Sequence, residues 1–114
     1  MMKALAGFVL ALSLVGGAAH AEDALPAGRA EAAKPLIAEQ CVKCHVVPGF
    51  PADRVQPAVN APSFEEIAAN PARYPDSQIA AFLRQPHYPM KGFVLSKRDI
   101  ANIIAFIRSL REGR

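Results

Sequence analysis

The 114-residue sequence has little of several features that define common protein classes. It contains no tryptophan and two cysteines, and its 13 basic and 10 acidic residues give a formal net charge of +3. Two cysteines are too few for a disulfide-dense scaffold. So small a charge argues against a large phosphate-binding surface, and we expect no nucleic-acid partner. The 52% of hydrophobic residues fits one small folded domain.

The sequence also lacks an uninterrupted apolar run of the roughly 20 residues that a transmembrane helix needs. Its N-terminus has Lys3, an apolar stretch over residues 4–15, two glycines, and the small-x-small sequence AHA at residues 19–21. This order is typical of an export signal. We therefore expect residues 1–21 to be a cleavable secretory signal peptide and residues 22–114 to be a periplasmic domain without stable membrane insertion. An uncleaved anchor is the alternative.

No stretch of the mature sequence alternates polar and apolar residues strictly enough to predict a strand. The apolar residues instead recur at helical spacing, most clearly over about residues 97–110, where isoleucines stand at positions i, i+3, i+4 and i+7. Further helices are expected over about residues 31–43, 63–70 and 76–85. Pro35 interrupts the first of these, which either starts late enough to place the proline in its first turn or kinks there. The sequence therefore predicts an all-α domain.

The expected helix starts rest on side chains that cap free backbone N–H groups. Ser63 with Glu66 and Ser96 with Asp99 have the spacing of capping boxes, and the first of the two is the better formed. A third cap is expected from the Asp or Ser at positions 76–77. The segments between the helices, which are rich in proline, are expected to be loops.

The two cysteines are spaced for one particular chemistry. Cys41-Val42-Lys43-Cys44-His45 is the CxxCH pattern of c-type haem attachment. Two thiols one helical turn apart can each add across a vinyl group of haem, and the histidine that follows is placed to bind the iron as its proximal ligand. The sequence therefore predicts one haem c, bound covalently through Cys41 and Cys44, with His45 on the iron.

Three other interpretations use the same residues. A structural zinc site needs four ligands, and beyond Cys41, Cys44 and His45 the mature sequence offers only His87. A thioredoxin-like redox pair belongs beside a βαβ pattern, which the sequence lacks. A local disulfide would leave His45 without a role. Haem attachment accounts for all three residues of the motif together.

These residues resemble those of the small class I cytochromes c, of the bacterial single-haem type. The resemblance covers nearly all of residues 29–114 and rests on CVKCH, APSF, and YPM followed by LSKRDIANIIAFIRSL, in that order. It implies the class I cytochrome c fold, with three to five helices around one covalently attached haem c. The first and last helices would cross where Ala33 and Ile37 meet Ile103 and Phe106, although the family usually has glycine at the position of Ala33.

The resemblance also identifies Met90 as the second axial iron ligand. A thioether favours Fe(II), so the expected function is that of a high-potential electron carrier and not of an enzyme. The alternatives are His87 as the ligand, or a labile or open sixth position in a peroxidase-like, gas-binding or sensor haem protein. The implied partners are protein redox donors and acceptors, such as a dehydrogenase, an oxidase or a bc1-type complex.

Further expectations concern the residues around the haem. By resemblance, the carbonyl of Pro62 accepts a hydrogen bond from the second ring nitrogen of His45. The candidates for holding the haem propionates are Tyr74, Tyr88, Arg54 and Arg84. The residues expected to line the haem pocket are Phe50, Phe64, Phe82, Leu83, Phe93 and Ile104. Residues 84–114 carry seven basic residues against two acidic ones. A basic patch on this part of the chain, including Lys91 and also Lys43, would steer an acidic partner, whereas the alternative is an ordinary solvated surface.

Overall fold

The computed structural model describes residues 24–56, 59–85, 90, 92 and 94–113. These residues form α1 (Ala30–Glu39), the short 3-10 helix η1 (Cys41–Lys43), α2 (Phe64–Ala69), α3 (Asp76–Arg84) and α4 (Lys97–Glu112). They contain no strand, and the all-α prediction is confirmed. None of these helices combines the length and apolarity needed to cross a bilayer.

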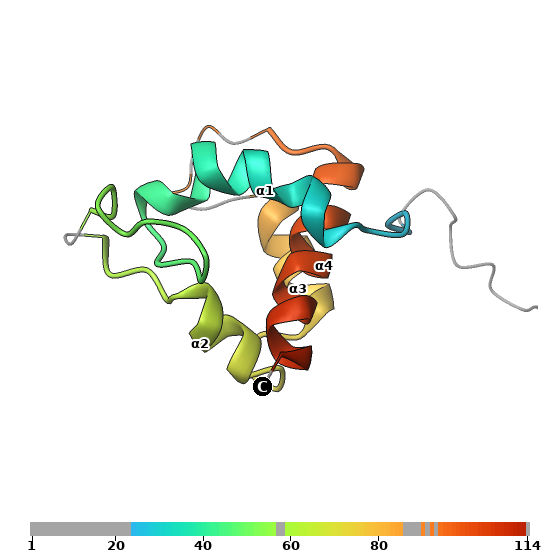
Figure 1. Ribbon diagram of the computed structural model, residues 1–114. Coiled ribbons are helices and arrows are strands. Elements are labelled where there is room, and N and C mark those ends of the chain that lie inside the picture. The colour runs from blue at the N-terminus through green and yellow to red at the C-terminus, as the bar shows by residue number, and fades with distance from the viewer. Residues whose placement is uncertain (1–23, 57–58, 86–89, 91, 93, 114) are drawn as a thin grey trace, which may run out of the picture.

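Helix α4 is the element on which the others are assembled. Helices α1, α2 and α3 all contact it, and α1 lies across it in Figure 1. Ala33 and Ile37 of α1 and Ile103 and Phe106 of α4 are all buried in one core cluster, as the expected crossing of the first and last helices requires. Burial of these apolar side chains stabilises the crossing, because it removes their surface from water.

Helix α1 contains its proline in the interior. It begins at Ala30, so Pro35 is its sixth residue, and the interpretation that placed this proline in the first turn is wrong. A proline there leaves the carbonyl of Glu31 without its usual helical donor. The helix tolerates this loss because its opposite face, with Ala33 and Ile37, is fully buried against the core.

The better of the two capping boxes lies at the start of α4 and not at the start of α2. The hydroxyl of Ser96 accepts the N–H of Asp99 at 3.0 Å, and the Asp99 carboxylate accepts the N–H of Ser96 at 2.9 Å. At Ser63 the structure shows the bond from the N–H of Glu66 to the hydroxyl, at 3.0 Å. Both serines therefore cap their helices, but the order of quality that the sequence suggested is reversed.

A close approach fixes the segment before α1 to the middle of α4. Gly28 lies against the backbone carbonyl of Ala101 so closely that no β-carbon would fit. Beside it the backbone N–H of Arg29 donates to Oδ1 of Asn102 at 2.9 Å, which satisfies a buried polar side chain. The glycine that the packing requires is therefore Gly28, whereas the crossing itself accommodates Ala33.

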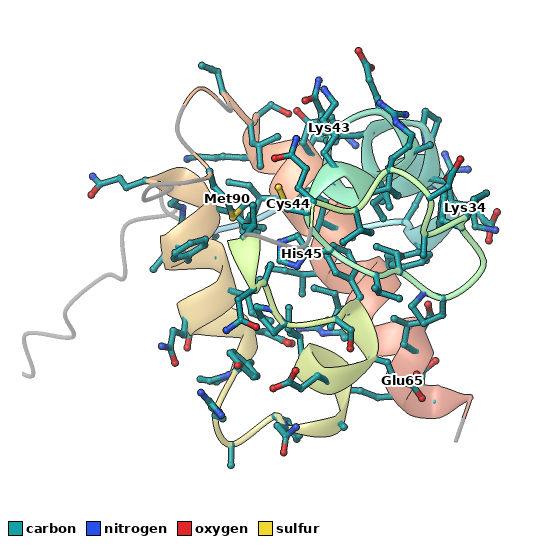
Figure 2. The ribbon with its side chains drawn as sticks, turned by 90° about the vertical axis from the view of Figure 1, so that its left-hand side faces the viewer. Lys34, Lys43, Cys44, His45, Glu65 and Met90 are labelled. Carbon is teal, nitrogen blue, oxygen red and sulfur yellow. The ribbon has the colours of Figure 1, made fainter. Side chains whose placement is uncertain are left out.

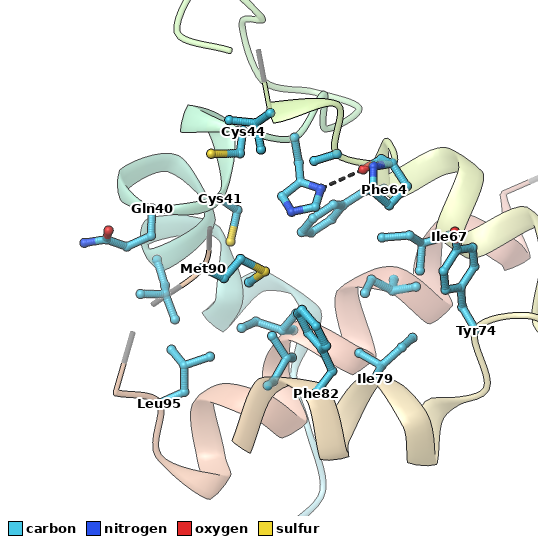
Figure 3. A pocket seen from close by; sticks show the side chains of 18 of the residues that line it. Gln40, Cys41, Cys44, Phe64, Ile67, Tyr74, Ile79, Phe82, Met90 and Leu95 are labelled. Atoms are coloured by element: carbon cyan, nitrogen blue, oxygen red, sulfur yellow. Dashed lines mark hydrogen bonds between the residues drawn. The ribbon is translucent and has the colours of Figure 1, made fainter. Parts of the chain in front are cut away.

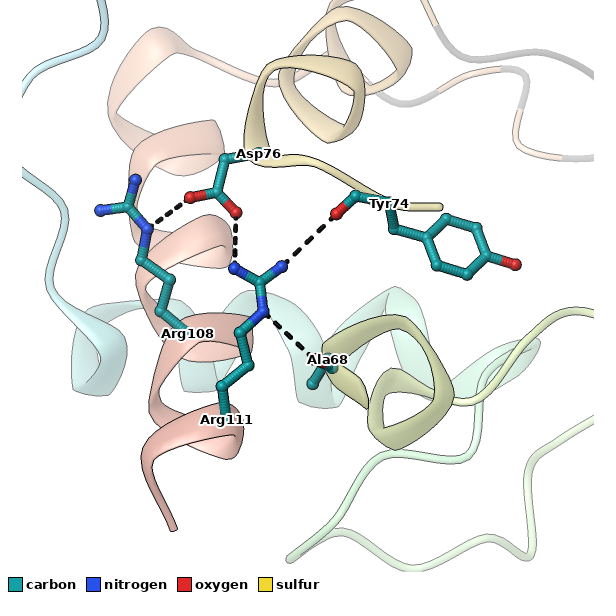
Figure 4. Close-up of polar contacts among 5 residues, drawn as sticks. All are labelled: Ala68, Tyr74, Asp76, Arg108 and Arg111. Carbon is teal, nitrogen blue, oxygen red and sulfur yellow. Dashed lines mark hydrogen bonds and ion pairs between the residues drawn. The ribbon is translucent and has the colours of Figure 1, made fainter. Parts of the chain in front are cut away.

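Helix α3 begins without a side-chain cap. Its N-cap is Pro75, so the expectation that Asp76 or Ser77 caps it is wrong. The Asp76 carboxylate instead accepts from Nε of Arg108 at 2.6 Å and from Nη1 of Arg111 at 2.9 Å (Figure 4). Two charged donors on α4 outcompete the backbone N–H groups of α3, because charge-assisted hydrogen bonds are the stronger ones.

Arg111 joins α4 to two further segments. Its Nε donates to the carbonyl of Ala68 at 3.2 Å, and its Nη2 donates to the carbonyl of Tyr74 at 3.4 Å (Figure 4). Burial by itself would raise the pKa of Asp76, but the hydrogen bonds and positive charges of Arg108 and Arg111 outweigh burial and lower that pKa below 3.8. The charged form of Asp76 is thus the form that the fold stabilises.

Replacing Asp76 with Asn should lower the free energy of unfolding at pH 7 by about 1 kcal/mol, because the arginines lose their anionic partner. Since the folded-state pKa of Asp76 lies below 3.8, its stabilisation is present above that pH and is lost as the pH falls through the folded-state pKa. The variant should therefore lose less stability than the wild type on acidification below pH 4. Denaturant unfolding at several pH values measures this difference.

The matched control is Asp53→Asn, which removes an exposed carboxylate from the loop between η1 and α2. This change should leave the acid dependence of unfolding close to that of the wild type. Equal acid dependence in all three proteins would contradict the role given to Asp76.

Candidate functional site

A large apolar cavity opens in the centre of the helices. Its volume is about 500 Å³, within the range of roughly 300–1,000 Å³ that is usual for cofactor and ligand sites. Segments far apart in the sequence line it: η1, the loop before α2, helices α2, α3 and α4, and the segment before α4 (Figure 3). The four residues predicted from the sequence, Cys41, Cys44, His45 and Met90, all line this cavity.

The CxxCH turn presents both cysteines to the cavity. Cys41 begins η1 and Cys44 is the residue that follows its end. The backbone N–H groups of Cys44 and His45 both donate to the carbonyl of Cys41, at 3.2 and 2.9 Å, which winds the turn tightly. Cys41 and Cys44 do not form a disulfide with each other, and Val42 between them is buried and anchors the turn. The local hydrogen bonding therefore brings the two cysteines together at one side of the cavity.

The surroundings of Cys41 favour the neutral form of its thiol. Burial, and secondarily the neighbouring Cys44, raise the pKa of Cys41 to about 11. A neutral thiol is compatible with the apolar surroundings, because burying a charge there would be costly.

The imidazole of His45 is held by the backbone of a distant loop. Its Nδ1 lies 2.6 Å from the carbonyl oxygen of Pro62. A carbonyl oxygen only accepts, so Nδ1 carries the hydrogen and Nε2 keeps its lone pair for a metal. The Pro62 partner that the family resemblance implied is therefore confirmed. The loop reaches Pro62 through Asn60, which has a left-handed φ of 47°, a conformation that asparagine adopts more readily than most residues.

Met90 comes from a different part of the chain and faces the same cavity. Figure 2 shows Met90, Cys44 and His45 gathered in one region of the molecule. The thioether is partly buried against the core cluster. The rival ligand His87 lies outside the described residues, and so does Lys91.

Three of the predicted lining residues, Phe64, Phe82 and Leu83, do line the cavity. Phe64 and Leu83 are buried, whereas Phe82 is 39% exposed although it is a large apolar side chain. An aromatic ring left this open at the rim of an apolar cavity has room for a further apolar surface to cover it. The exposure of Phe82 is therefore an observation of this structure that fits a flat hydrophobic cofactor.

Two of the predicted lining residues do not reach the cavity. Phe50 packs edge-on against Phe106, with ring centroids 6.2 Å apart. Ile104 lines a second cavity beside the segment before α1. The apolar stripe of α4 borders both cavities, because Ile103 and Ile107 line the first cavity and Ile104 lines the second. Helical periodicity identified the stripe but could not divide it between its two neighbours. Phe93 lies outside the described residues.

Of the candidates for holding haem propionates, one lines the main cavity and two of the others lie elsewhere. Tyr74 lines the main cavity, whereas Arg54 donates to the carbonyl of Ala38 at 3.2 Å and Arg84 lines the second cavity. Tyr88 lies outside the described residues. The main cavity has three further polar lining residues that were not predicted from the sequence, Gln40, Asn60 and Gln78. These residues stand in no motif, so only the folded structure shows that they share a site.

The basic surplus near the C-terminus is partly used inside the fold. Arg108 and Arg111 form ion pairs with Asp76 and are therefore committed to joining α4 with α3. Lys43 lies in the CxxCH turn, and its ammonium group is 3.5 Å from the side-chain oxygen of Gln40. The expected basic patch is thus reduced by two of the residues that suggested it.

Comparisons with known proteins agree with this geometry. The family model of cytochrome c matches residues 30–111. The chain is 33% identical over 107 residues to cytochrome c-552 of Bradyrhizobium diazoefficiens, a match that covers 94% of this chain and 95% of that protein. No solved structure matches the chain. The protein therefore belongs to the cytochrome c family, as the sequence suggested. Its cofactor is covalently bound haem c, and it is an electron-transfer haem protein.

Proposed function

We propose that this protein is a periplasmic single-haem electron carrier in which Cys41 and Cys44 form the two thioether bonds and His45 and Met90 are the axial iron ligands. The observation that carries the proposal is the convergence of all four side chains on one apolar cavity. Its redox partners are other proteins that donate or accept one electron, such as a dehydrogenase, an oxidase or a bc1-type complex.

The chain holds the proximal ligand in a defined chemical state. The hydrogen bond from Nδ1 of His45 to the Pro62 carbonyl fixes the tautomer and leaves Nε2 free to coordinate. It also makes the imidazole a more basic ligand, because the N–H bond is polarised toward the carbonyl oxygen. Bound haem supplies the one-electron exchange between Fe(II) and Fe(III), and the protein is not consumed or altered covalently in the exchange.

Met90 and the cavity walls act on the reduction potential in the same direction. A thioether is a soft ligand and stabilises the reduced iron. The apolar walls, which include Ile67, Ile79 and Leu83, disfavour the additional positive charge of the oxidised iron. A site with both ligand positions occupied leaves no position for a substrate. These features suit electron transfer better than peroxide turnover or gas binding.

The purified haem protein tests this proposal directly. The ferric form should be low-spin, with the weak near-red absorption band of methionine ligation, and should be reduced and reoxidised reversibly by one electron. The pigment should stay with the polypeptide after denaturation and solvent extraction. A high-spin ferric spectrum together with rapid peroxide consumption would show an enzyme, and pigment lost on extraction would refute covalent attachment.

Replacing Met90 with Ala should keep the haem covalently bound but lower the reduction potential by on the order of 100 mV, because the soft sixth ligand is lost. The iron of the variant should also bind added imidazole or cyanide more readily than the wild type. Potentiometric titration and ligand titration measure the two effects.

The matched control is His87→Ala, which removes the rival ligand from the same segment. This variant should keep the wild-type potential and the near-red band. If His87→Ala changes the potential and Met90→Ala leaves it unchanged, the sixth ligand is His87.

The proposed location requires export and signal cleavage. Cleavage after Ala21 would leave a mature chain that begins at Glu22 and retains the whole haem site. Intact-protein mass spectrometry of the haem-bearing protein from the periplasmic fraction should therefore give the mass of residues 22–114 plus one haem. Haem-bearing protein that retains Met1 and sediments with the membrane would support the uncleaved anchor instead.

A further inference from the structure

We propose that Phe64 is a positioning residue that fixes the plane of the His45 imidazole and so controls the electronic asymmetry of the iron site. The inference rests on the proposed role of His45 as an iron ligand. It assigns to Phe64 a function beyond lining the cavity.

The first observation is the contact between the two rings. Phe64 lies edge-on to His45, with centroids 5.3 Å apart and planes inclined by 64°. The hydrogen bond to Pro62 fixes the direction of one ring nitrogen, but hydrogen bonds tolerate a broad range of angles and leave the ring some freedom to tilt. A ring in edge-to-face contact restricts that tilt, because the favourable geometry is lost when either ring turns.

The second observation is that Phe64 is itself fixed by the backbone around it. It is the first residue of α2, directly after the cap Ser63, and only 4% of it is exposed. Its N–H donates at 3.0 Å to the carbonyl of Val46, the residue that follows His45. Two hydrogen bonds therefore join the His45–Val46 segment to the Pro62–Phe64 segment, and the two rings move together with this joined backbone.

The third observation is a second ring contact of Phe64. It meets Phe106 of α4, with ring centroids 6.2 Å apart and planes inclined by 61°. Phe106 in turn contacts Phe50. Phe106 is buried in the core cluster, so Phe64 rests against the helix that α1, α2 and α3 all contact. Two aromatic contacts, from His45 to Phe64 and from Phe64 to Phe106, therefore connect the His45 ring to α4.

The orientation of an axial imidazole has a measurable consequence in the oxidised protein. The plane of the ligand ring sets the direction in which the unpaired electron spreads over the porphyrin, and surrounding contacts set that plane. The resonances of the haem methyl groups in ferric cytochromes report this direction. A residue that only fills the core would leave their pattern unchanged when it is shortened.

The test is proton NMR of the ferric haem protein carrying Phe64→Leu, with Phe50→Leu as the matched control. Both variants should unfold at lower denaturant concentration, because each loses a buried or partly buried aromatic ring. Only Phe64→Leu should change the spread and order of the haem methyl shifts, since Phe50 has no ring contact with His45 among those seen. Phe64→Tyr, which keeps the ring, should restore the wild-type pattern.

Unchanged haem methyl shifts in Phe64→Leu, or equal changes in Phe64→Leu and Phe50→Leu, would overturn the inference. If Phe64→Leu does not take up haem, Phe64→Met serves in its place, because an unbranched side chain adapts to the vacated space. Failure of the proposed ligation would be seen separately, in the wild type itself, as the lack of hyperfine-shifted resonances from the His45 ring.

Discussion

The hydrogen bond between His45 and the carbonyl of Pro62 is the interaction on which the site depends. It joins the end of the CxxCH turn to the loop that leads into α2, across 17 residues of sequence. Without it, the tight turn at Cys41 would still present two thiols, but nothing would choose the ring nitrogen that faces the cavity. A single backbone carbonyl thus gives the histidine of a local motif a defined tautomer, and this tautomer leaves Nε2 available for the proposed iron ligation.

The same cavity explains why the fold needs its cofactor. A domain of about 90 residues buries little more than about 60% of the surface that its unfolded chain exposes. In this protein, Ile103 and Ile107 of the central helix face an open cavity of about 500 Å³, and Phe82 stands at its rim. Haem therefore completes the hydrophobic core as well as supplying the iron. In so small a chain, binding of the cofactor and stability of the fold depend on each other, because haem stabilises the folded state.

What the sequence predicted well was local, and what it missed depends on contacts through space. Patterns among residues close together in the sequence predict the CxxCH turn, the serine caps and the apolar stripe of α4. The partnership of Pro62 with His45 came from resemblance to a family and not from spacing. By contrast, nothing near Asp76 in the sequence indicates that its carboxylate prefers arginines more than 30 residues away to its own helix. The close approach at Gly28 likewise becomes visible only when α4 is in place.

Helix α4 divides its surface among three tasks, and this division bears on electron transfer. One side faces the haem cavity through Ile103, a second holds the segment before α1 through Asn102, and its last turns join α3 through Arg111. A carrier gains from ligands that keep their positions in both oxidation states, because each electron transfer then requires little rearrangement of the protein. The contacts from Phe106 to Phe64 and on to His45 connect this shared helix to the proposed proximal ligand. The packing that stabilises the fold is therefore also the packing that would hold this ligand in place.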